Sequence, residues 1–436
     1  MGAPYRVGIV GCSGIAIAPP QRSAASLRSP LPHSHAAAFH AVPATSVVAV
    51  CDIMPEATAR YCATWGEAAA YTDYREMIAR ENLDLLSIVT PDHLHGLITM
   101  AALKRGKHVT LHKPIANRLT EGKQVIDLAK KTNVATHLIA WDSNGKMDTV
   151  MEWINSGAIG TLKEVHNWTN RPVWPQYPTI PSDTPPVPQG LNWDLWLGPE
   201  KERAYHPNYT NMVFRGWYDF GGGSMADMGY YSLWTVFNAL QLESPTIIEP
   251  NRSHTCGFNE MIPFRVNNNF SFPMASSVRF KYPAKGSRPA IDLCWYDGGI
   301  RPAVPEELYK ENKELPQEGM MFIGDQGKIL CDFHANNPRI LSGKRAGESK
   351  KDVGDANNPD QYIPKPWIQS IKAGTQCPGS FRDAWPITEA INLYAVALRI
   401  GKTLYYDAAA MRVTNVSEAN AYLSREYRKG WEPSSI

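Results

Sequence analysis

The sequence has no excess of charge of either sign and no long hydrophobic run. Lys and Arg together number 44 against 42 Asp and Glu, which gives a net charge of +2. A chain this close to neutrality, with no basic stripe, gives no electrostatic reason to expect nucleic acid as a partner. No apolar stretch approaches the roughly 18 residues that a membrane-spanning helix needs, so a membrane is not expected as a partner either.

The seven cysteines are scattered, and no two of them form a C-x-x-C pair, which is typical of reduced thiols. The pairs His33/His35 and His93/His95 have the spacing of metal ligands, but no carboxylate or cysteine cluster completes a site, so no metal is predicted. The first five residues lack the charged and apolar regions of a signal peptide. We expect a cytoplasmic protein, and a periplasmic location stays open for a chain whose leader has been removed.

A chain of 436 residues is too long for one compact core, so two domains are expected. Up to residue 141, strand-like runs alternate with helical patterns, which predicts a dinucleotide-binding α/β domain, residues 1–141, with a doubly wound parallel sheet. In residues 142–436, later strands alternate apolar and polar residues, as a half-buried antiparallel sheet does. The expected strands are 5–10, 47–50, 83–89, 109–111 and 135–140 in the first domain, and 163–169, 277–281, 290–296, 319–323 and 327–331 in the second.

A glycine-containing turn follows the first expected strand and reads Gly11-Cys12-Ser13-Gly14-Ile15-Ala16. It is similar to the G-x-G-x-x-G/A loop, in which backbone amides and a helix N-terminus hold a pyrophosphate. The second strand ends at Asp52, and an acid there can bind a ribose 2′-hydroxyl and would repel a 2′-phosphate, so NAD is favoured over NADP. The predicted cofactor contacts from this part of the chain are Gly11, Ser13, Gly14, Ile15 and Asp52.

Asp52 lies 38 residues after Gly14, whereas roughly 20 are usual at such a site. The excess falls in residues 17–33, where early prolines prevent the usual tight passage from loop to helix. We expect an inserted loop near the cofactor phosphates. Its Arg22 and Arg28 either contact phosphate or are solvated loop charges.

A lysine stands after the expected strand 109–111, directly before a proline. Because the residue before proline is kept out of the helical region, Lys113 is presented at a strand end, where open α/β sheets bind their ligands. A plain surface lysine is the alternative that its position alone leaves open. Strand 83–89 ends in the same way, in residues 90–95, and helices are expected over residues 55–65 and 96–105.

Several segments together resemble the Gfo/Idh/MocA family of NAD(P)-dependent oxidoreductases of sugars, inositols and related polyols. The similarity includes Thr90-Pro91 with His95 and Lys113-Pro114, and it covers nearly the whole chain. The usual family tripeptide is Glu-Lys-Pro, and His112 stands here at its first position. The resemblance implies a Rossmann domain joined to a C-terminal α/β domain with an open, mostly antiparallel sheet, in a homodimer or homotetramer. It adds Thr90, Pro91, His95, His112 and Lys113 to the predicted cofactor contacts.

The segment from Asp219 to Tyr231 has three consecutive glycines, followed by a predicted helix on which Asp227 and Tyr231 share one face. Ser224 is expected to cap this helix. The segment resembles the family motif Gly-x-x-x-Asp-x-Gly-x-His, with tyrosine in place of histidine, as in glucose–fructose oxidoreductase and in dihydrodiol or xylose dehydrogenases. The resemblance implies that Tyr231 is the acid–base group, whereas the residues alone leave an ordinary core aromatic open.

A free tyrosine titrates near pH ~10, too high for general-base action at neutral pH. A lysine ammonium about 4 Å from the phenolate contributes about 4 kcal/mol at an effective dielectric constant of ~20, which would lower the pKa of Tyr231 far enough. The predicted catalytic residues are therefore Lys113, Asp227 and Tyr231. The predicted substrate contacts are these three together with Arg171, His206 and Arg215, whose side chains can bond sugar hydroxyls.

The sequence thus predicts an oxidoreductase that moves hydride between NAD and a hydroxyl or carbonyl of a pyranose sugar or glycoside. A redox-neutral alternative would oxidise the sugar transiently, break a neighbouring bond and return the hydride, with glycoside hydrolysis or elimination as the net result. The unusual His112 and the expected inserted loop are compatible with this redox-neutral alternative. A non-catalytic sensor of NAD and sugar is a third interpretation, and the retention of Lys113, Asp227 and Tyr231 speaks against it.

Overall fold

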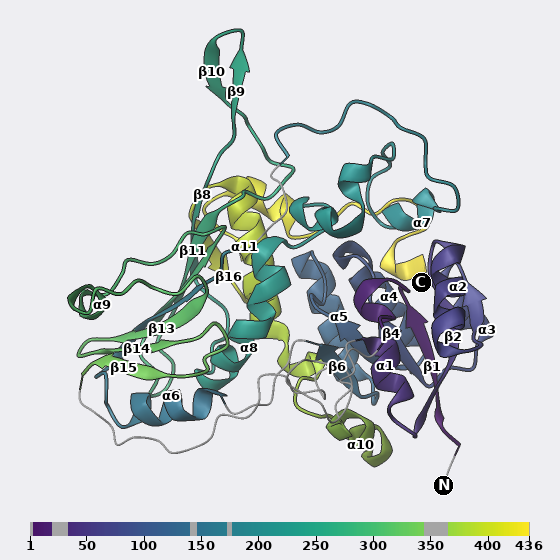
Figure 1. The fold of residues 1–436 in the computed structure, drawn as a ribbon, viewed down its shortest axis with the longest axis horizontal. Helices are drawn as coiled ribbons and strands as arrows, with labels where there is room; N and C mark the ends of the chain where they lie inside the picture. The colour runs from purple at the N-terminus through teal and green to yellow at the C-terminus, as the bar shows by residue number, and fades with distance from the viewer. Residues whose placement is uncertain (1–2, 20–33, 140–145, 172–176, 344–364, 436) are drawn as a thin grey trace.

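The computed structural model describes residues 3–19, 34–139, 146–171, 177–343 and 365–435. Two sheets lie side by side, a six-stranded one built from the first part of the chain and a nine-stranded one built from the rest (Figure 1). The predicted domain boundary at 141/142 lies outside the described residues, as do Arg22 and Arg28. No helix in the described ranges combines the length and the apolar character needed to cross a bilayer.

The first sheet has the strand order β3-β2-β1-β4-β5-β6, and all its adjacent strands are parallel. Val10, at the end of β1, lies opposite Cys51 of β2 and Ile88 of β4, so the loops that follow these strands meet at one edge. The predicted doubly wound sheet is confirmed. The strands are β1 (Tyr5–Val10), β2 (Thr45–Cys51), β3 (Ala69–Tyr71), β4 (Leu85–Ile88), β5 (His108–His112) and β6 (Thr136–Ile139).

Helices connect these strands, and helix α4 begins earlier in the chain than predicted. Residues 92–95 were expected to form a loop after a strand, but they are the first turn of α4. Pro91 is compatible with the position just before a helix, and Asp92 in the first turn suits the positive end of the helix dipole. The helices are α1 (His35–His40), α2 (Pro55–Trp65), α3 (Tyr74–Arg80), α4 (Asp92–Lys104) and α5 (Leu119–Lys131).

The second sheet has the order β15-β14-β13-β7-β12-β11-β8-β16-β17 within the described residues. Only β7 and β12 pair in parallel, and the other neighbours are antiparallel, which confirms the mostly antiparallel sheet. The strands are β7 (Leu162–Trp168), β8 (Ile247–Arg252), β11 (Ser276–Tyr282), β12 (Ile291–Asp297), β13 (Gly319–Gly324), β14 (Lys328–Cys331), β15 (Arg339–Ser342), β16 (Leu404–Asp407) and β17 (Arg412–Val413).

Two helices, α8 and α11, lie between the nine-stranded sheet and the first domain (Figure 1). Helix α11 contacts β8 and β11 on one side and α5 on the other, so it joins the two halves of the molecule. Helix α10 packs against the first domain, where Trp367 is buried in a cluster with Val7 and Ile9. The helices are α6 (Lys146–Asn155), α7 (Trp193–Leu197), α8 (Tyr230–Ala239), α9 (Glu306–Lys310), α10 (Lys365–Ala373) and α11 (Trp385–Ile400).

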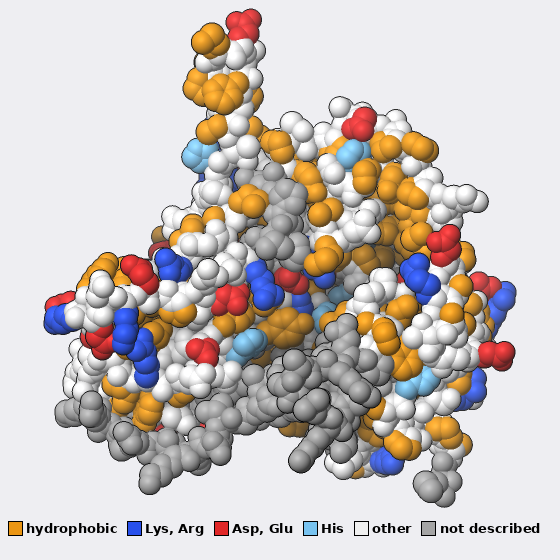
Figure 2. Space-filling view, in the orientation of Figure 1, with side chains coloured by type: hydrophobic (Ala, Val, Ile, Leu, Met, Phe, Trp, Pro, Cys, Tyr) orange, Lys and Arg blue, Asp and Glu red, His pale blue; other side chains and the backbone are white. Residues whose placement is uncertain are grey.

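A hairpin that the sequence analysis did not predict projects from the molecule, with strands β9 (Cys256–Asn259) and β10 (Ile262–Arg265) (Figure 1). Its apolar side chains are exposed, as the orange tip in Figure 2 shows. The alternation of apolar and polar residues gave no signal here because neither face of this ribbon is buried against the core. The exposed side chains are Phe258, Met261, Ile262 and Phe264.

The C-terminal segment returns to the first domain through a buried ion-pair network. The Arg425 guanidinium pairs with Glu121 of α5 at 2.5 Å and with Glu200 at 2.6 Å, and the side chain is 3% exposed. Tyr427 donates a hydrogen bond to Glu121 at 2.8 Å. Buried charges of this kind are tolerated because each has partners.

We expect Arg425→Ala to lower the free energy of unfolding by about 3–5 kcal/mol, because it leaves buried Glu121 without its cation and Glu200 with Arg118 alone. Lys402→Ala is the control, since Lys402 and Glu418 form an exposed pair, and exposed pairs contribute little. Urea denaturation followed by circular dichroism measures both. Equal effects of the two substitutions would show that the buried network does not hold the C-terminal segment in place.

Candidate functional site

Lys113 follows β5 directly and meets Asp227 from the other half of the chain. Lys113 Nζ lies 2.5 Å from Asp227 Oδ1, and the two side chains are 5% and 14% exposed. Arg215 Nε lies 3.3 Å from the same oxygen. One carboxylate therefore receives two cations at the boundary between the Rossmann domain and the second domain.

Asp227 lies in a π-helix, Met225–Gly229, that leads into α8. Such wide turns occur frequently at functional sites. The predicted cap by Ser224 is wrong, because Ser224 has helical backbone angles and its hydroxyl donates to the carbonyl oxygen of Arg171 at 3.2 Å. The preceding glycines allow close packing, and a Cβ at Gly221 would lie 2.5 Å from Arg215 Cα.

Tyr231 lies beside Lys113, but the lysine contacts the ring face and not the hydroxyl. Lys113 Nζ is 5.0 Å from the ring centroid, while Tyr231 Oη lies 3.3 Å from His112 Nε2. Burial, and then the charge of Asp227, raise the pKa of Tyr231 above its ordinary value. The predicted lowering of this pKa is therefore wrong, since Asp227 takes up the charge of the lysine that was expected to produce it.

The carboxylate of Asp227 stays ionised despite its burial. Burial favours the neutral form, but Lys113 and Arg215 outweigh it and hold the pKa of Asp227 below its ordinary range. Arg171 contributes in the same direction. The site thus contains a fixed anion that keeps cationic donors in place.

Sequence reasoning missed Asp92, at the start of α4. It is 6% exposed, and its Oδ2 accepts a hydrogen bond from the Gly222 amide at 3.1 Å, which ties α4 to the glycine segment before the π-helix. Burial raises the pKa of Asp92 to about 6, against the opposing effect of Arg215 and Lys113. Its position one residue after the strand-end Thr90-Pro91 pair is the signal that could have found it.

The predicted phosphate loop lies at the ends of β1 and β4. Gly11 has φ 93°, and a Cβ there would lie 2.3 Å from the Val89 carbonyl oxygen, so only glycine lets the loop pass. A Cβ on Gly14 would meet nothing within 4 Å, which leaves open space above the loop. Asp52 accepts from the Cys12 and Met54 amides at 2.8 and 2.9 Å and keeps lone pairs for a further donor. These residues fit a dinucleotide.

Two of the predicted cofactor residues face other protein groups. The ring nitrogens of His95 lie 2.6 Å from the Pro114 carbonyl oxygen and 2.7 Å from that of Thr90, so His95 connects the loops after β4 and β5. His112 faces Tyr231 and, on its other side, His35. Their contacts with a cofactor, like that of Pro91, remain predictions.

The structure brings most predicted substrate residues together, with one exception. Arg171 is half-exposed, and its guanidinium contacts Met228 Sδ at 3.1 Å, next to Asp227 in sequence. His206 lies elsewhere, because its Nδ1 accepts from the Asn208 amide and its Nε2 is 3.4 Å from Asp183. No described contact joins His206 to Lys113, Asp227 or Tyr231. Its role stays a prediction.

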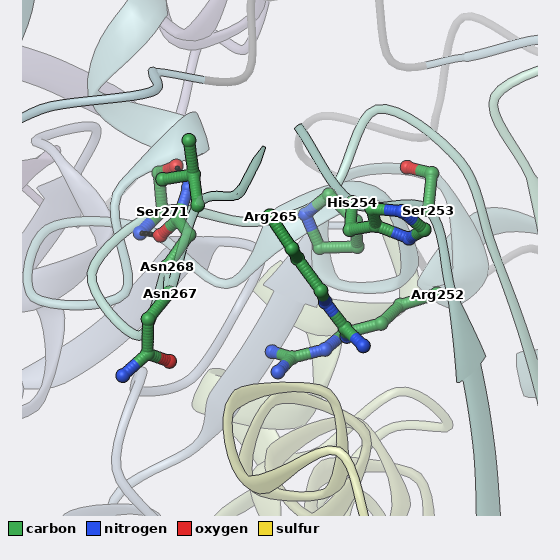
Figure 3. A pocket seen from close by; sticks show the side chains of 9 residues that line it. Arg252, Ser253, His254, Arg265, Asn267, Asn268 and Ser271 are labelled. Atoms are coloured by element: carbon green, nitrogen blue, oxygen red, sulfur yellow. Dashed lines mark hydrogen bonds between the residues drawn. The ribbon is translucent and has the colours of Figure 1, made fainter. Parts of the chain in front are cut away.

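Figure 2 shows a hollow between the two halves of the molecule, in which acidic, basic and histidine side chains gather. A separate cavity of about 280 Å³ lies at the base of the β9–β10 hairpin (Figure 3). It contains no predicted site residue, and Arg252 there donates to the carbonyl oxygens of Leu398 and Arg399 at the end of α11. It is lined by Arg252, Ser253, His254, Arg265, Val266, Asn267, Asn268, Ser271 and Pro273.

Among the described residues, one group could hold a metal ion, formed by Glu164, His166 and Cys294 on β7 and β12. The carboxylate and the imidazole already bond each other at 2.7 Å, and His166 Nδ1 contacts the Tyr296 hydroxyl at 3.0 Å. None of the metal-like histidine pairs of the sequence belongs to this group.

The raised pKa of Asp92 predicts a pH-dependent effect of its removal. Between its unfolded pKa near 3.8 and its folded pKa of about 6, the native protein binds more protons, so wild-type stability falls as pH rises. The Asp92→Asn variant has no carboxyl group at this position, so its stability lacks this pH dependence. Its stability relative to wild type should therefore increase from pH 4 to 7, by about 3 kcal/mol at most.

Asp219→Asn is the matched control with the opposite sign. Although burial opposes ionisation, Arg118 and Arg203 hold the pKa of Asp219 below its ordinary value. The stability that Asp219 contributes is therefore present above its unfolded pKa and lost as pH falls. Denaturation curves at several pH values measure both variants, and parallel pH profiles of the two would contradict the assignment for Asp92.

Two family models match the chain. One is described as an oxidoreductase family with an NAD-binding Rossmann fold and matches residues 5–139. The other is described as the C-terminal alpha/beta domain of an oxidoreductase family and matches residues 151–251. Both are models of Gfo/Idh/MocA proteins, and together they cover more than half of the chain.

Curated relatives include three proteins with sugar-related names. Levoglucosan dehydrogenase of Pseudarthrobacter phenanthrenivorans is 31% identical over 28% of this chain and 31% of its own length. D-xylose 1-dehydrogenase (NADP(+)) of Hypocrea jecorina is 23% identical over 70% of this chain and 74% of its own. A glycosyl hydrolase family 109 protein of Porphyromonas gingivalis is 29% identical over 32% of each. The chain thus matches about a third of the length of two of these relatives.

Solved structures share the fold over almost the whole chain. The WlbA dehydrogenase from Bordetella pertussis, in complex with NADH and UDP-GlcNAcA, has a TM-score of 0.58 at 16% identity and covers 93% of this chain and 99% of its own. Levoglucosan dehydrogenase, in complex with NADH and L-sorbose, has a TM-score of 0.54 at 15% identity with the same coverage. The matched models and the two-sheet fold agree, and the chain belongs to the Gfo/Idh/MocA family of oxidoreductases.

Proposed function

We propose that the chain is an NAD-dependent oxidoreductase that transfers hydride between NAD and a hydroxyl or carbonyl carbon of a pyranose sugar or glycoside. The meeting of Lys113, Asp227 and Tyr231 across the domain boundary is the observation that carries this proposal. The names of the relatives support a sugar as the substrate class. Asp52, whose charge would repel a 2′-phosphate, supports NAD, although one relative is named for NADP.

In the oxidation direction, the hydroxyl O–H bond of the sugar breaks and its proton binds to Tyr231 Oη, while the C–H hydrogen leaves as hydride. NAD, when bound, supplies the acceptor for that hydride. Lys113 stabilises the negative charge that develops on the sugar oxygen, and Asp227 holds the lysine in position. Because the phenol of Tyr231 is protonated at neutral pH, it accepts this proton only as its own proton leaves.

Arg215 and Arg171 are proposed to bind sugar hydroxyls beside the reacting carbon. Arg215 is anchored by Asp227, and its guanidinium also lies 4.6 Å from the Phe214 ring centroid. Arg171 keeps a half-exposed side chain that can reach a ligand. The homo-oligomer implied by the family resemblance, a dimer or tetramer, stays a prediction, as does the cytoplasmic location.

Tyr231→Phe is expected to lower kcat for sugar oxidation by about 10²–10⁴, because the hydroxyl proton loses its acceptor. NAD binding, measured by quenching of tryptophan fluorescence, should persist. Tyr230→Phe is the matched control: this neighbouring hydroxyl bonds Thr388 Oγ1 at 3.0 Å in the core, so its loss should leave the rate close to wild type. Wild-type turnover in Tyr231→Phe would remove Tyr231 from the mechanism.

The redox-neutral reaction is the second candidate, because a glycosyl hydrolase family 109 protein is among the relatives. One screen separates the candidates: incubation with NAD or NADP and a panel of levoglucosan, D-xylose and p-nitrophenyl glycosides. We expect NADH to accumulate, and to do so faster than NADPH. Release of p-nitrophenol without net NADH would support the redox-neutral reaction instead, and NAD binding without either product would support a sensor.

A further inference from the structure

Tyr231 is the first of a row of hydrogen-bonding side chains. Tyr231 Oη lies 3.3 Å from His112 Nε2, and His112 Nδ1 lies 3.4 Å from His35 Nε2. His35 Nδ1 is in turn 2.7 Å from Ser87 Oγ. His35 and Ser87 are fully buried, and His112 is 9% exposed. The row connects the second domain, through Tyr231, with β5, α1 and β4 of the first.

We propose that His112 accepts the phenolic proton of Tyr231 during sugar oxidation, and that His35 is a positioning residue that keeps the proton of His112 on Nδ1. This proposal rests on the proposed function and deepens it. The substrate proton binds to Tyr231 Oη as the phenolic proton moves to His112 Nε2. In reduction both protons move back, so the phenol passes a proton on without existing as a free phenolate.

The hydrogen-bond directions along the row agree with this assignment. A phenol is a stronger acid than the N–H of a neutral imidazole, so Tyr231 donates and His112 Nε2 accepts. A neutral imidazole carries one proton, which is then on His112 Nδ1 and donates to His35 Nε2. The proton of His35 is consequently on Nδ1 and donates to Ser87 Oγ. Each group in the row then has one defined role. The two contacts to His112, at 3.3 and 3.4 Å, are long, as catalytic hydrogen bonds often are before a substrate binds.

The surroundings of His112 keep its imidazole neutral before the reaction, so Nε2 has a lone pair available for the phenolic proton. Burial lowers the pKa of His112, and so do the charges of the adjacent Lys113 and of Arg215, with His35 and His95 as further titratable groups. Burial likewise lowers the pKa of His35 to about 3. Hydride transfer removes the positive charge of the oxidised nicotinamide, so a proton on His112 leaves the net charge of the site unchanged.

The first test compares pH profiles of kcat for the best sugar of the panel above. Wild type should be nearly flat between about pH 6 and 9, because the acceptor is a neutral imidazole. In His112→Gln the amide oxygen can still accept a hydrogen bond but not a proton, so Tyr231 must ionise by itself. Its rate should be about 10²–10³ lower at pH 7 and rise about tenfold per pH unit. A flat, wild-type profile in His112→Gln would overturn the proposal.

The matched control for this test is His40→Gln. His40 Nε2 lies 3.0 Å from the hydroxyl of Tyr61, so it is also a histidine bonded to a tyrosine, and it is in the same helix as His35. This variant should keep the wild-type rate and profile. A change equal to that of His112→Gln would show that loss of any such pair disturbs the enzyme, and the proposal would fall.

The second test needs no substrate. In unliganded protein with ¹⁵N-labelled histidine, the His112 signals are those lost in His112→Gln. We expect a proton on Nδ1 and none on Nε2 in wild type. His35→Phe should mix the two tautomers, and His35→Gln, whose amide oxygen can replace the Nε2 acceptor, should restore the first. A His112 proton on Nε2 in wild type would overturn the proposal.

The two proposals fail in distinguishable ways. If Tyr231→Phe is inactive but His112→Gln is unaffected, the role of His112 is wrong and the proposed function stands. If Tyr231→Phe is fully active, the proposed function falls, and the assignment of His112 as acceptor of its proton falls with it, whatever tautomer the spectra show.

Discussion

The buried ion pair between Lys113 and Asp227 is the constraint on which the site depends. Removing two charges from water is costly, and such a pair persists only when its geometry is good and its remaining donors and acceptors have partners. Here Arg215 provides a second cation to Asp227, and the lysine lies over the ring of Tyr231. Because Lys113 directly follows β5 and Asp227 lies in the π-helix, the pair also connects the two halves of the molecule.

This pairing changes what the lysine can do for the tyrosine. An isolated ammonium beside a phenol would stabilise the phenolate, as the sequence analysis assumed. With the anion of Asp227 at 2.5 Å, that effect is largely cancelled, and burial then decides the pKa of Tyr231. A phenol that stays protonated is useful only if its proton has somewhere to go. The hydrogen-bond partner of its hydroxyl is therefore as important as the lysine.

The sequence predicted the elements whose signals are local. Helix α2 begins with Pro55 and ends before Gly66, which has φ 105°, and both of its bounds were predicted correctly. The parallel strands were recognisable as continuous apolar runs. The residues that follow β4 and β5 were predicted to lie at the cofactor and substrate site. The π-helix and the β9–β10 hairpin were missed, because the first looks like an ordinary helix in sequence and the second buries neither face.

The contacts between side chains could not be predicted from spacing. His35 and His112 are 77 positions apart, and nothing in either segment shows that their rings meet. This contact bears on the unusual residue at position 112. A glutamate at position 112, as in the usual family tripeptide, would add a second buried carboxylate beside Lys113 and compete with Asp227 for it. A neutral imidazole avoids that competition and still accepts a proton, but it needs a partner to fix its tautomer. In the proposed proton transfer that partner is His35, the first residue of α1, so the two histidines act as one unit.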